Sequence, residues 1–537
     1  MNSKLQILIA TFLLAVFHSL GSMAQRSATL YVVEHDVIEK REHPCVVPGR
    51  VTQEFVDRIE RITYLDSTMT IIYRDGTVKQ YLLADIARVA TRSGGFYATT
   101  SFLPDRYKAL FDFDSHYEYP GAEDSTAYAS DTAFVATSIV NITLGNDTIL
   151  VGGDTALVDV TCKDGAFCIA SVAAGIEYRI CGQCDDRILV FEGDKSVRIV
   201  LDNVHLQCAD SAAIISRINA PIYITTAPGS YNDLTAIWAT EVINLSGEGV
   251  LRLVSDANEI ALLRSASDII ICGGVYDLFA SGTDSKGIHA CRNLTITAGN
   301  YHIITTGASF DHTEESLGES RSYAILANEL VTLNGGKYFI KTFGTKVAQE
   351  PEASGAVGIA SLGNIVVNGG EYYIAAFDDP INTPKTVIVN GGRFVTTSLT
   401  DDGFNANTLK VTGGEIYAYG PDGGFDTKSS NAFTVSNGTL IGIGPKSSKS
   451  KTGESYQPSL YFKDIMGLQK YVRIVAESGE PFAAPSGDVL VIETPAEAKM
   501  CVFFTSQELE RDHTYHLETA TDQEQWHSVD GSATLCK

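Results

Sequence analysis

Val331-Thr332-Leu333-Asn334-Gly335-Gly336 is a phrase that returns along the chain, as Ile365–Gly370 and again as Val387–Gly392. Each copy is an alternating apolar run that ends in a glycine turn, and a second alternating run follows it. Related copies end at Gly274, Gly299, Gly336, Gly370, Gly392, Gly414 and Gly438. The basic period is therefore about 22 to 25 residues, with about a dozen extra residues near 309–320 and 345–354.

A period of this length, built from short strands and glycine turns, leaves no room for a ten-residue helix and is typical of a parallel β-helix. We expect an all-β chain with a right-handed parallel β-helix at 138–445. Alternate residues of a strand point to opposite faces, so the second and fourth positions after the last glycine should face the core. The second position holds Tyr276, Tyr301, Tyr338, Tyr372, Phe394, Ile416 and Leu440.

The first position after the last glycine tests this register independently, because it should face water. In four successive copies it reads Lys337, Glu371, Arg393 and Glu415. Residues in adjacent parallel strands lie about 4.8 Å apart, where opposite charges attract modestly and like charges repel. The alternation of sign supports the proposed stacking of one repeat on the next.

The remaining segments divide into an export signal and flanking modules. Lys4, an apolar run at 7–17 and the small-x-small site ending at Ala24 predict a signal peptide at 1–24. Residues 25–92 predict a small β-rich module, with a strand, turn and strand at 69–81, and residues 93–137 a linker. Residues 446–537 predict a β-rich cap. The mature chain is expected in the periplasm, on the cell surface or secreted.

Composition limits the partners. The 537 residues carry 40 Lys and Arg against 65 Asp and Glu, a formal net charge of −25, so nucleic acid and anionic membranes are disfavoured and cations favoured. At 44% hydrophobic the chain is neither disordered throughout nor collagen-like, and no later stretch has about 18 apolar residues in a row. The ten cysteines allow disulfides or buried thiols, and Cys181 with Cys184 lacks the second pair that a zinc site needs.

Acidic phrases precede three successive strands of the repeat and predict a metal site. They begin at Asp378, Asp401 and Asp422, 23 and 21 residues apart. Carboxylate and amide oxygens that converge from neighbouring repeats are the ligands that Ca²⁺ takes in sets of six to eight. The expected ligands are Asp378, Asp379, Asn382, Asp401, Asp402, Asn405, Asp422 and Asp426. The alternative is that Asp, Asn and Gly simply favour turns.

Aromatic side chains occupy the third position after the last glycine and should point outward. This position predicts carbohydrate binding by Phe339, Tyr373 and Tyr417, with His302 one repeat earlier. An aromatic ring offers a flat apolar face to the C–H side of a sugar. The alternative is that these side chains pack against a loop, notably the extra residues at 309–320 and 345–354.

These motifs also resemble a known family. Gly287-Ile288-His289-Ala290, the phrase Asp401–Asn407 and the Gly-Gly strands are similar to exported bacterial calcium-dependent carbohydrate-binding β-helix proteins of the cellulose- and pectin-binding type. That family is distantly similar to family-nine polysaccharide lyases. The resemblance covers about 138–516 and implies bound Ca²⁺ and the binding of cellulose or an acidic polysaccharide. Pro380 and Gly423 interrupt the family's acidic phrase, and the earlier repeats have lost its acids, so calcium is expected only in the last three repeats.

Three functions remain open at this point. The first is non-catalytic binding of a polysaccharide, with Ca²⁺ either structural or bridging to uronate carboxylates. The second is a calcium-dependent lyase acting on uronate-containing glycans, in which Lys385, Lys410 or Lys428 would remove the proton next to the uronate carboxyl group. The third is a surface adhesin or rod. Exposed lysines are usually solvated charges, which favours the binder.

Overall fold

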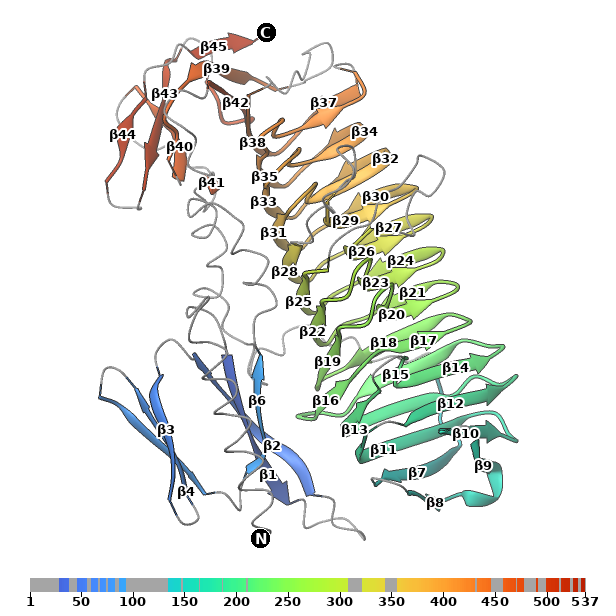
Figure 1. Ribbon diagram of the computed structural model, residues 1–537. Helices are drawn as coiled ribbons and strands as arrows, with labels where there is room; N and C mark the ends of the chain where they lie inside the picture. Colours follow the sequence, from blue (N-terminus) through green and yellow to red (C-terminus); the bar gives the residue numbers. More distant parts are fainter. Residues whose placement is uncertain are drawn as a thin grey trace. The chain divides into compact units, whose positions relative to one another are not determined.

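The computed structural model describes most of 134–445 and parts of the chain on either side (Figure 1). The described ranges are 29–37, 46–55, 59–65, 68–73, 76–82, 86–92, 134–145, 148–163, 165–185, 187–208, 211–307, 321–342, 355–429, 432–445, 457–469, 471–477, 489–490, 499–510, 513–521, 525–529 and 533–536. The predicted signal peptide, both predicted insertions and residues 93–133 of the predicted linker lie outside them.

The chain forms two compact units, Met1–Pro104 and Asp105–Lys537. In the first unit, β1 (Thr29–Val37) pairs antiparallel with both β2 (Val46–Phe55) and β6 (Ile86–Arg92). A second sheet holds β3 (Ile59–Leu65), β4 (Thr68–Tyr73) and β5 (Val78–Leu82). The antiparallel pairing of β4 with β5 confirms the predicted strand, turn and strand.

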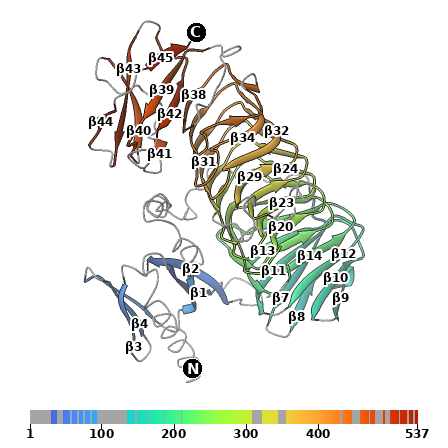
Figure 2. The same cartoon turned by 45° about the horizontal axis from the view of Figure 1, so that its top comes forward.

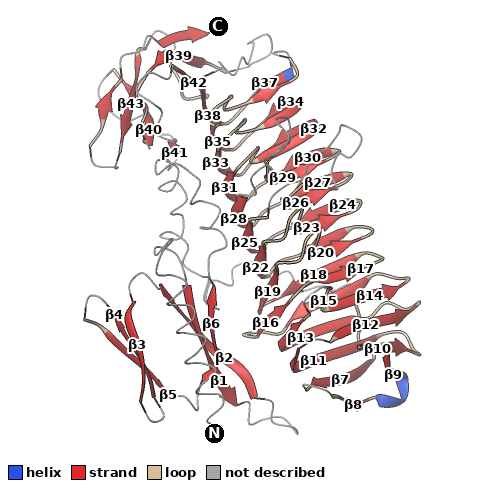
Figure 3. Ribbon diagram, viewed as in Figure 1, coloured by secondary structure: helices blue, strands red, loops and turns tan. Residues whose placement is uncertain are grey.

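The second unit is all-β and consists mainly of one large, mostly parallel sheet (Figure 3). Its repeats contribute strands to three ladders, in which each strand lies on the equivalent strand of the neighbouring repeat (Figure 2). Within the described residues, helical structure is limited to a 3-10 turn at Thr155–Leu157 and to Ala432. The strand period predicted from the glycine phrases is thus present.

The three ladders are named A, B and C. Ladder A holds β10 (Ala166–Ser171), β12 (Ile188–Gly193), β14 (Ile214–Ile218), β17 (Ile237–Ala239), β20 (Ala261–Ser265), β23 (Lys286–Ala290), β26 (Tyr323–Ala327), β29 (Val357–Ser361), β32 (Ile381–Val389), β34 (Asn405–Val411) and β36 (Asp426–Thr427). Ladder B holds β7 (Ser138–Leu144), β11 (Ile176–Asp185), β13 (Arg198–Gln207), β15 (Ile222–Thr226), β18 (Ile243–Gly247), β21 (Ile269–Ile271), β24 (Asn293–Ile296), β27 (Leu330–Leu333), β30 (Asn364–Val367) and β37 (Phe433–Val435), together with the second halves of β32 and β34.

Ladder C holds the strands that follow the glycine turns. They are β16 (Tyr231–Leu234), β19 (Val250–Ser255), β22 (Val275–Ala280), β25 (Asn300–Thr305), β28 (Lys337–Thr342), β31 (Glu371–Ala376), β33 (Arg393–Ser398), β35 (Glu415–Tyr419) and β38 (Thr439–Gly444). In the turn before these strands the second glycine has a positive φ, as at Gly370 (φ 104°). A Cβ there would lie 2.9 Å from the carbonyl oxygen of Gly336 in the previous repeat, so only glycine fits.

Antiparallel strands flank the ladders. Before them come β8 (Ile149–Gly153) and β9 (Val158–Lys163), which pair with β7 and β10. After them, β39 (Ser459–Ile465), β42 (Met500–Thr505) and β45 (Ala533–Cys536) pair side by side, and β42 also pairs with β38. A four-stranded sheet holds β40 (Tyr471–Ala476), β41 (Val489–Leu490), β43 (Tyr515–Ala520) and β44 (His527–Ser528).

The core of ladder C is a stack of aromatic rings, as the register predicts. Tyr338 lies 4.6 Å from the ring of Tyr301 and 4.6 Å from the ring of Tyr372, and all three side chains are fully buried. Each hydroxyl donates to the turn of its own repeat, as Tyr338 does to the Gly335 carbonyl at 2.9 Å. The charged column beside it is also as predicted, because Lys337, Glu371, Arg393 and Glu415 pair in successive strands.

Candidate functional site

The acidic phrases lie where the chain enters the last three strands of ladder A. Backbone pairing places Asn382 beside Asn405 and Asn405 beside Asp426. A few residues before Asn405 and Asp426, Asp402 forms a parallel bridge with Gly423, and the Asp422 backbone amide donates to the Asp401 carbonyl at 3.3 Å. The predicted columns therefore exist in the fold, because the spacing of 21 to 23 residues equals one repeat at this end of the ladder.

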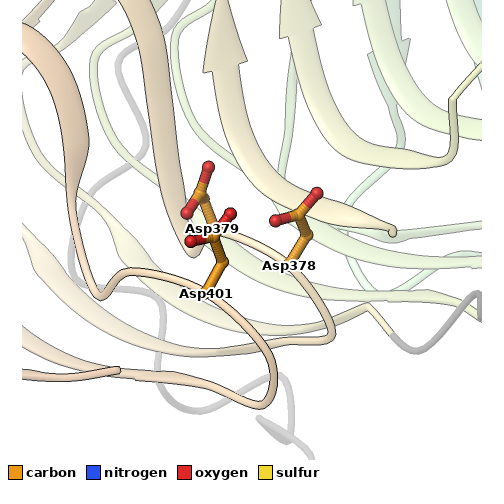
Figure 4. A group of neighbouring side chains, drawn as sticks. All are labelled: Asp378, Asp379 and Asp401. Atoms are coloured by element: carbon orange, nitrogen blue, oxygen red, sulfur yellow. The ribbon is translucent and has the colours of Figure 1, made fainter. Parts of the chain in front are cut away.

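Five carboxylates come together at this edge in two groups that share Asp401, and Figure 4 shows the group of Asp378, Asp379 and Asp401. The first group is Asp378, Asp379 and Asp401, and the second is Asp401, Asp402 and Asp422. Within each group one oxygen of every carboxylate lies within 4.8 Å of the others. Asp378, Asp379 and Asp402 are 5%, 2% and 4% exposed, whereas Asp401 and Asp422 are half-buried. Each group thus has a buried side and an accessible side.

Asp379 is at the centre of the hydrogen bonds in this cluster. Its Oδ1 accepts from the Asp402 backbone amide at 3.2 Å, and its Oδ2 accepts from the side-chain amides of Asn382 and, at 3.2 Å, Asn405. Each amide also carries a carbonyl oxygen, which a half-turn about its terminal bond would bring to the same position. The donor set facing Asp379 therefore consists of carboxylate and amide oxygens.

Burial and mutual repulsion disfavour the charged form of these acids. Burial, followed by the nearby charge of Asp401, raises the pKa of Asp378 to about 7, although the Arg321 guanidinium offsets part of the rise. Burial also raises the pKa of Asp379 well above its usual range, and the charges of Asp378, Asp401 and Asp402 add to it. Like charges this close cannot all ionise without a counterion. The cluster fits a hard cation bound by oxygen.

Seven of the eight predicted ligands lie within these groups or donate to Asp379. Asp426 is the exception: it continues the column of Asn382 and Asn405 but is exposed and belongs to neither acid group. Its strand, β36, has only two residues, and this repeat is the last before ladder A ends. The similar spacing of the three phrases, 23 and 21 residues, does not reveal that the third one contributes Asp422 alone to the two acid groups.

The predicted aromatic column exists in ladder C, but its side chains differ in exposure. His302, Phe339, Tyr373, Val395 and Tyr417 pair in successive strands. Phe339 and Tyr373 are half-buried, whereas His302 is 7% exposed and Tyr417 is fully buried. The expectation that Tyr417 and His302 present an outward surface is therefore wrong. β41, from the C-terminal four-stranded sheet, lies against β33 and β35, the strand that carries Tyr417.

The ring faces of Phe339 and Tyr373 contact neighbouring side chains. The Phe339 and Tyr373 rings stack at 5.1 Å with an angle of 7° between their planes. The Lys337 ammonium lies 5.5 Å from the centre of the Phe339 ring. The Arg393 guanidinium lies 5.5 Å from the centre of the Tyr373 ring and donates a hydrogen bond to the Tyr373 hydroxyl at 2.6 Å. Side chains stacked in a parallel ladder turn their edges, rather than their faces, outward.

A charged network in the same column was missed by the sequence reasoning. Arg252 donates to Asp233 at 2.8 Å and lies 3.3 Å from Asp277, while His302 contacts Asp277 at 3.0 Å. At the other end His205 lies 3.3 Å from Asp233. These residues are mostly buried. The third position after the last glycine, counted from Gly274, is Asp277, and Arg252 is its neighbour on the preceding strand. The repeat pattern therefore contains a signal for this network.

Comparison with known proteins points to carbohydrates. Residues 164–403 match the model of a family described as carbohydrate-binding domain-containing protein. A solved structure of a polysaccharide lyase-like protein from C. thermocellum, a gadolinium derivative, has a TM-score of 0.35 and 17% identity to the chain, covering 51% of this chain and 96% of that chain. Comparison with curated proteins gave no match. The family match supports a carbohydrate-related function and the binding of a polysaccharide. Among the described residues, no helix has the length and hydropathy needed to cross a bilayer.

Proposed function

We propose that the chain is an exported, calcium-dependent polysaccharide-binding protein without catalytic activity, built on a right-handed parallel β-helix. The ladders A, B and C, with one strand per repeat in each, support the proposed fold. The family match over 164–403 supports the class of ligand. The observation that carries the proposal for the metal is the pair of carboxylate groups that share Asp401.

Calcium fits these residues because of their donor atoms and burial. Buried carboxylates are costly unless a cation or a proton neutralises them, and Arg321 is one basic group beside five acids. The donors are all oxygens, which suits Ca²⁺ rather than zinc. Asp378, Asp379 and Asp402 would hold the ion from the protein side, together with the amide oxygens of Asn382 and Asn405. Bound calcium would supply positive charge and free coordination positions at this edge.

The accessible side of the cluster accounts for the polysaccharide. Asp401 and Asp422 are half-buried, so an ion held there faces solvent on one side. Uronate carboxylates and sugar hydroxyls are hard oxygen ligands of the kind that Ca²⁺ accepts. An acidic polymer would otherwise be repelled by a chain with a net charge of −25. The ion would thus turn a repulsive edge into a binding site for an acidic glycan.

The lysines near the cluster favour binding over cleavage. A lyase needs a base beside the proton it removes, with a pKa brought near neutrality, usually by burial. Lys385, Lys410 and Lys428 are all exposed. None of them has the buried setting that such a base needs. We therefore propose a binder, and the lyase and the adhesin become distinct outcomes of the test.

The test is retention of the full chain on pectate, cellulose and a neutral glycan, with and without EGTA. We expect retention on pectate that EGTA weakens, with no rise in absorbance near 235 nm. Asp379→Asn should weaken retention, and Asp256→Asn, which changes an exposed acid outside both groups, should not. Rising absorbance would show a lyase, and no retention on any glycan would favour an adhesin. Retention that ignores both EGTA and Asp379→Asn would refute the calcium site.

Export and domain division are part of the same proposal. We place the signal at 1–24, the small β module at 25–92, the linker at 93–137, the binding domain at 138–445 and the cap at 446–537. Intact mass of the protein recovered after expression with its leader should correspond to a chain that begins at Gln25. Limited proteolysis should cut first within 93–137 and leave a stable fragment. A mature protein that keeps residues 1–24 would contradict the assignment of the signal.

A further inference from the structure

Ladder A carries an aromatic and cationic pair far from the acidic cluster. Trp238 on β17 and Arg264 on β20 are register neighbours on the outer face of adjacent strands. The Trp238 side chain is half-buried, and its Nε1–H donates to the Ala261 carbonyl at 2.6 Å. This hydrogen bond fixes the indole against the neighbouring repeat. On the preceding strand its register neighbour is Ile215, which is also half-buried, so the two side chains form a partly accessible apolar surface.

Arg264 is exposed, and the described part of the chain offers it no acidic partner. Among the residues that the structure describes, no carboxylate lies within ion-pair distance of its guanidinium. Arg217, on the same face two strands earlier, differs in this respect because it pairs with Glu192 at 3.4 Å. In a chain with 65 acids against 40 bases, an arginine beside a tryptophan that pairs with no described carboxylate adds local positive charge. It marks a place where an anion is attracted rather than repelled.

The pair is separate from the acidic cluster. In the outer column of ladder A, Trp238 and Arg264 are followed by His289, Leu326 and Ala360, and only then by Asn382. His289, Leu326 and Ala360 are buried, so they interrupt the accessible face. Five strand spacings separate β17 from β32, or about 24 Å. Trp238 and Arg264 lie within 164–403, the part that matches the carbohydrate-binding family model, whereas Asp422 of the acidic cluster lies beyond it.

We propose that Trp238 and Arg264 form a second, calcium-independent subsite that binds a uronate unit of an acidic glycan. The indole packs against the C–H face of the sugar ring, and the guanidinium donates two hydrogen bonds to the uronate carboxylate. A planar guanidinium matches a carboxylate in this way, whereas a neutral sugar offers it no charge. The proposal rests on the proposed function for its class of ligand, and it assigns acidic rather than neutral units to this subsite.

Intrinsic fluorescence isolates this subsite, because the chain has two tryptophans, Trp238 and Trp526. In a Trp526→Phe background all tryptophan emission comes from Trp238. We expect a saturable change in emission with oligogalacturonate in the presence of EGTA, and none with cello-oligosaccharide of equal length. Adding Arg264→Ala should weaken the titration about tenfold, the loss expected for a hydrogen bond to a charged group. The matched control Arg217→Ala should leave it unchanged.

The outcomes separate this subsite from the calcium site. An equal response to the neutral oligosaccharide, an unaltered titration in Arg264→Ala, or no response of Trp238 at all would overturn the subsite. Retention on pectate that still depends on calcium would show that the proposed function survives such a result. Conversely, a Trp238 titration that persists while EGTA has no effect on retention would uphold the subsite and refute the calcium site. Thermal midpoints equal to that of the parent protein would exclude a folding defect in the variants.

Discussion

The tyrosine stack in ladder C and the acidic cluster in ladder A are built by the same rule with opposite energetic results. In both, like side chains from neighbouring repeats lie close together: rings at 4.6 Å in the stack and carboxylate oxygens within 4.8 Å in the cluster. Stacked rings attract one another and exclude water, whereas carboxylates repel one another. A parallel ladder therefore multiplies whatever a single side chain contributes. The stack stabilises the protein by itself, and the cluster needs a partner.

The largest expected effect comes from removing a ring in the middle of the stack. Tyr338→Ala would leave a cavity between Tyr301 and Tyr372, and we expect a loss of about 3 to 5 kcal/mol in the free energy of unfolding. Tyr338→Phe keeps the ring and loses only the hydrogen bond to Gly335, which should cost about 1 kcal/mol. Urea denaturation measures both. Equal losses in the two variants would mean that the hydroxyl, not the stacking, matters.

His289 tests what happens to an ionisable group that is buried in ladder A near basic side chains. Burial lowers its pKa from 6.5 to about 4, and the charges of Lys286 and Arg264 add to this, while its contact with Asn328 at 3.2 Å opposes it. The unfolded chain takes up the proton first, so stability should fall by up to about 3 kcal/mol as the pH drops from 6.5 to 4.

Denaturation at several pH values should show that His289→Gln flattens this part of the stability profile. His516→Gln, which changes an exposed histidine, serves as the control and should leave the profile as it is. A profile that His289→Gln leaves unchanged would place the loss of stability at other groups.

The acidic cluster should respond to a neutral substitution with a sign that depends on calcium. In EGTA, Asp379→Asn removes one of several repelling charges. We therefore expect the free energy of unfolding to rise by about 1 to 2 kcal/mol, and the thermal midpoint to rise with it. With calcium the same change removes a ligand, and the stabilisation that the ion adds should shrink. Thermal unfolding with and without Ca²⁺ measures both. The same sign under both conditions would argue against a cation in the cluster.

The smallest effect is expected at the exposed Lys337 and Glu371 of the charged column beside the stack. Glu371→Lys would place three basic side chains in successive strands, between Lys337 and Arg393. The Lys337 to Glu371 pair is 4.0 Å apart and half-exposed on both sides, so we expect a loss of only about 0.5 kcal/mol, reduced further by salt. A loss above that of His289 protonation would show that this column contributes more than surface pairs usually do.

The repeat pattern was enough to predict the ladders and the residues that stack in them. Each glycine phrase sets the start of a strand, and the period of two then assigns Tyr338 to the core and Lys337 to solvent. The same count brought Asp378, Asp401 and Asp422 into neighbouring repeats. These are local relations, because a residue and its neighbour in the ladder are one period apart. Periodicity in the sequence therefore contains them.

Only the tertiary structure decided which outward positions stay accessible. Tyr417 and Phe339 occupy equivalent positions in the repeat, yet Tyr417 is fully buried and Phe339 is not. The strand against ladder C at that end, β41, comes from a segment about 70 residues further along the chain. Likewise, Trp238 and Tyr373 are both outward aromatic residues, but the faces of Tyr373 are taken by Phe339 and Arg393. Contacts between remote segments depend on how the folded chain packs, and no period in the sequence records them.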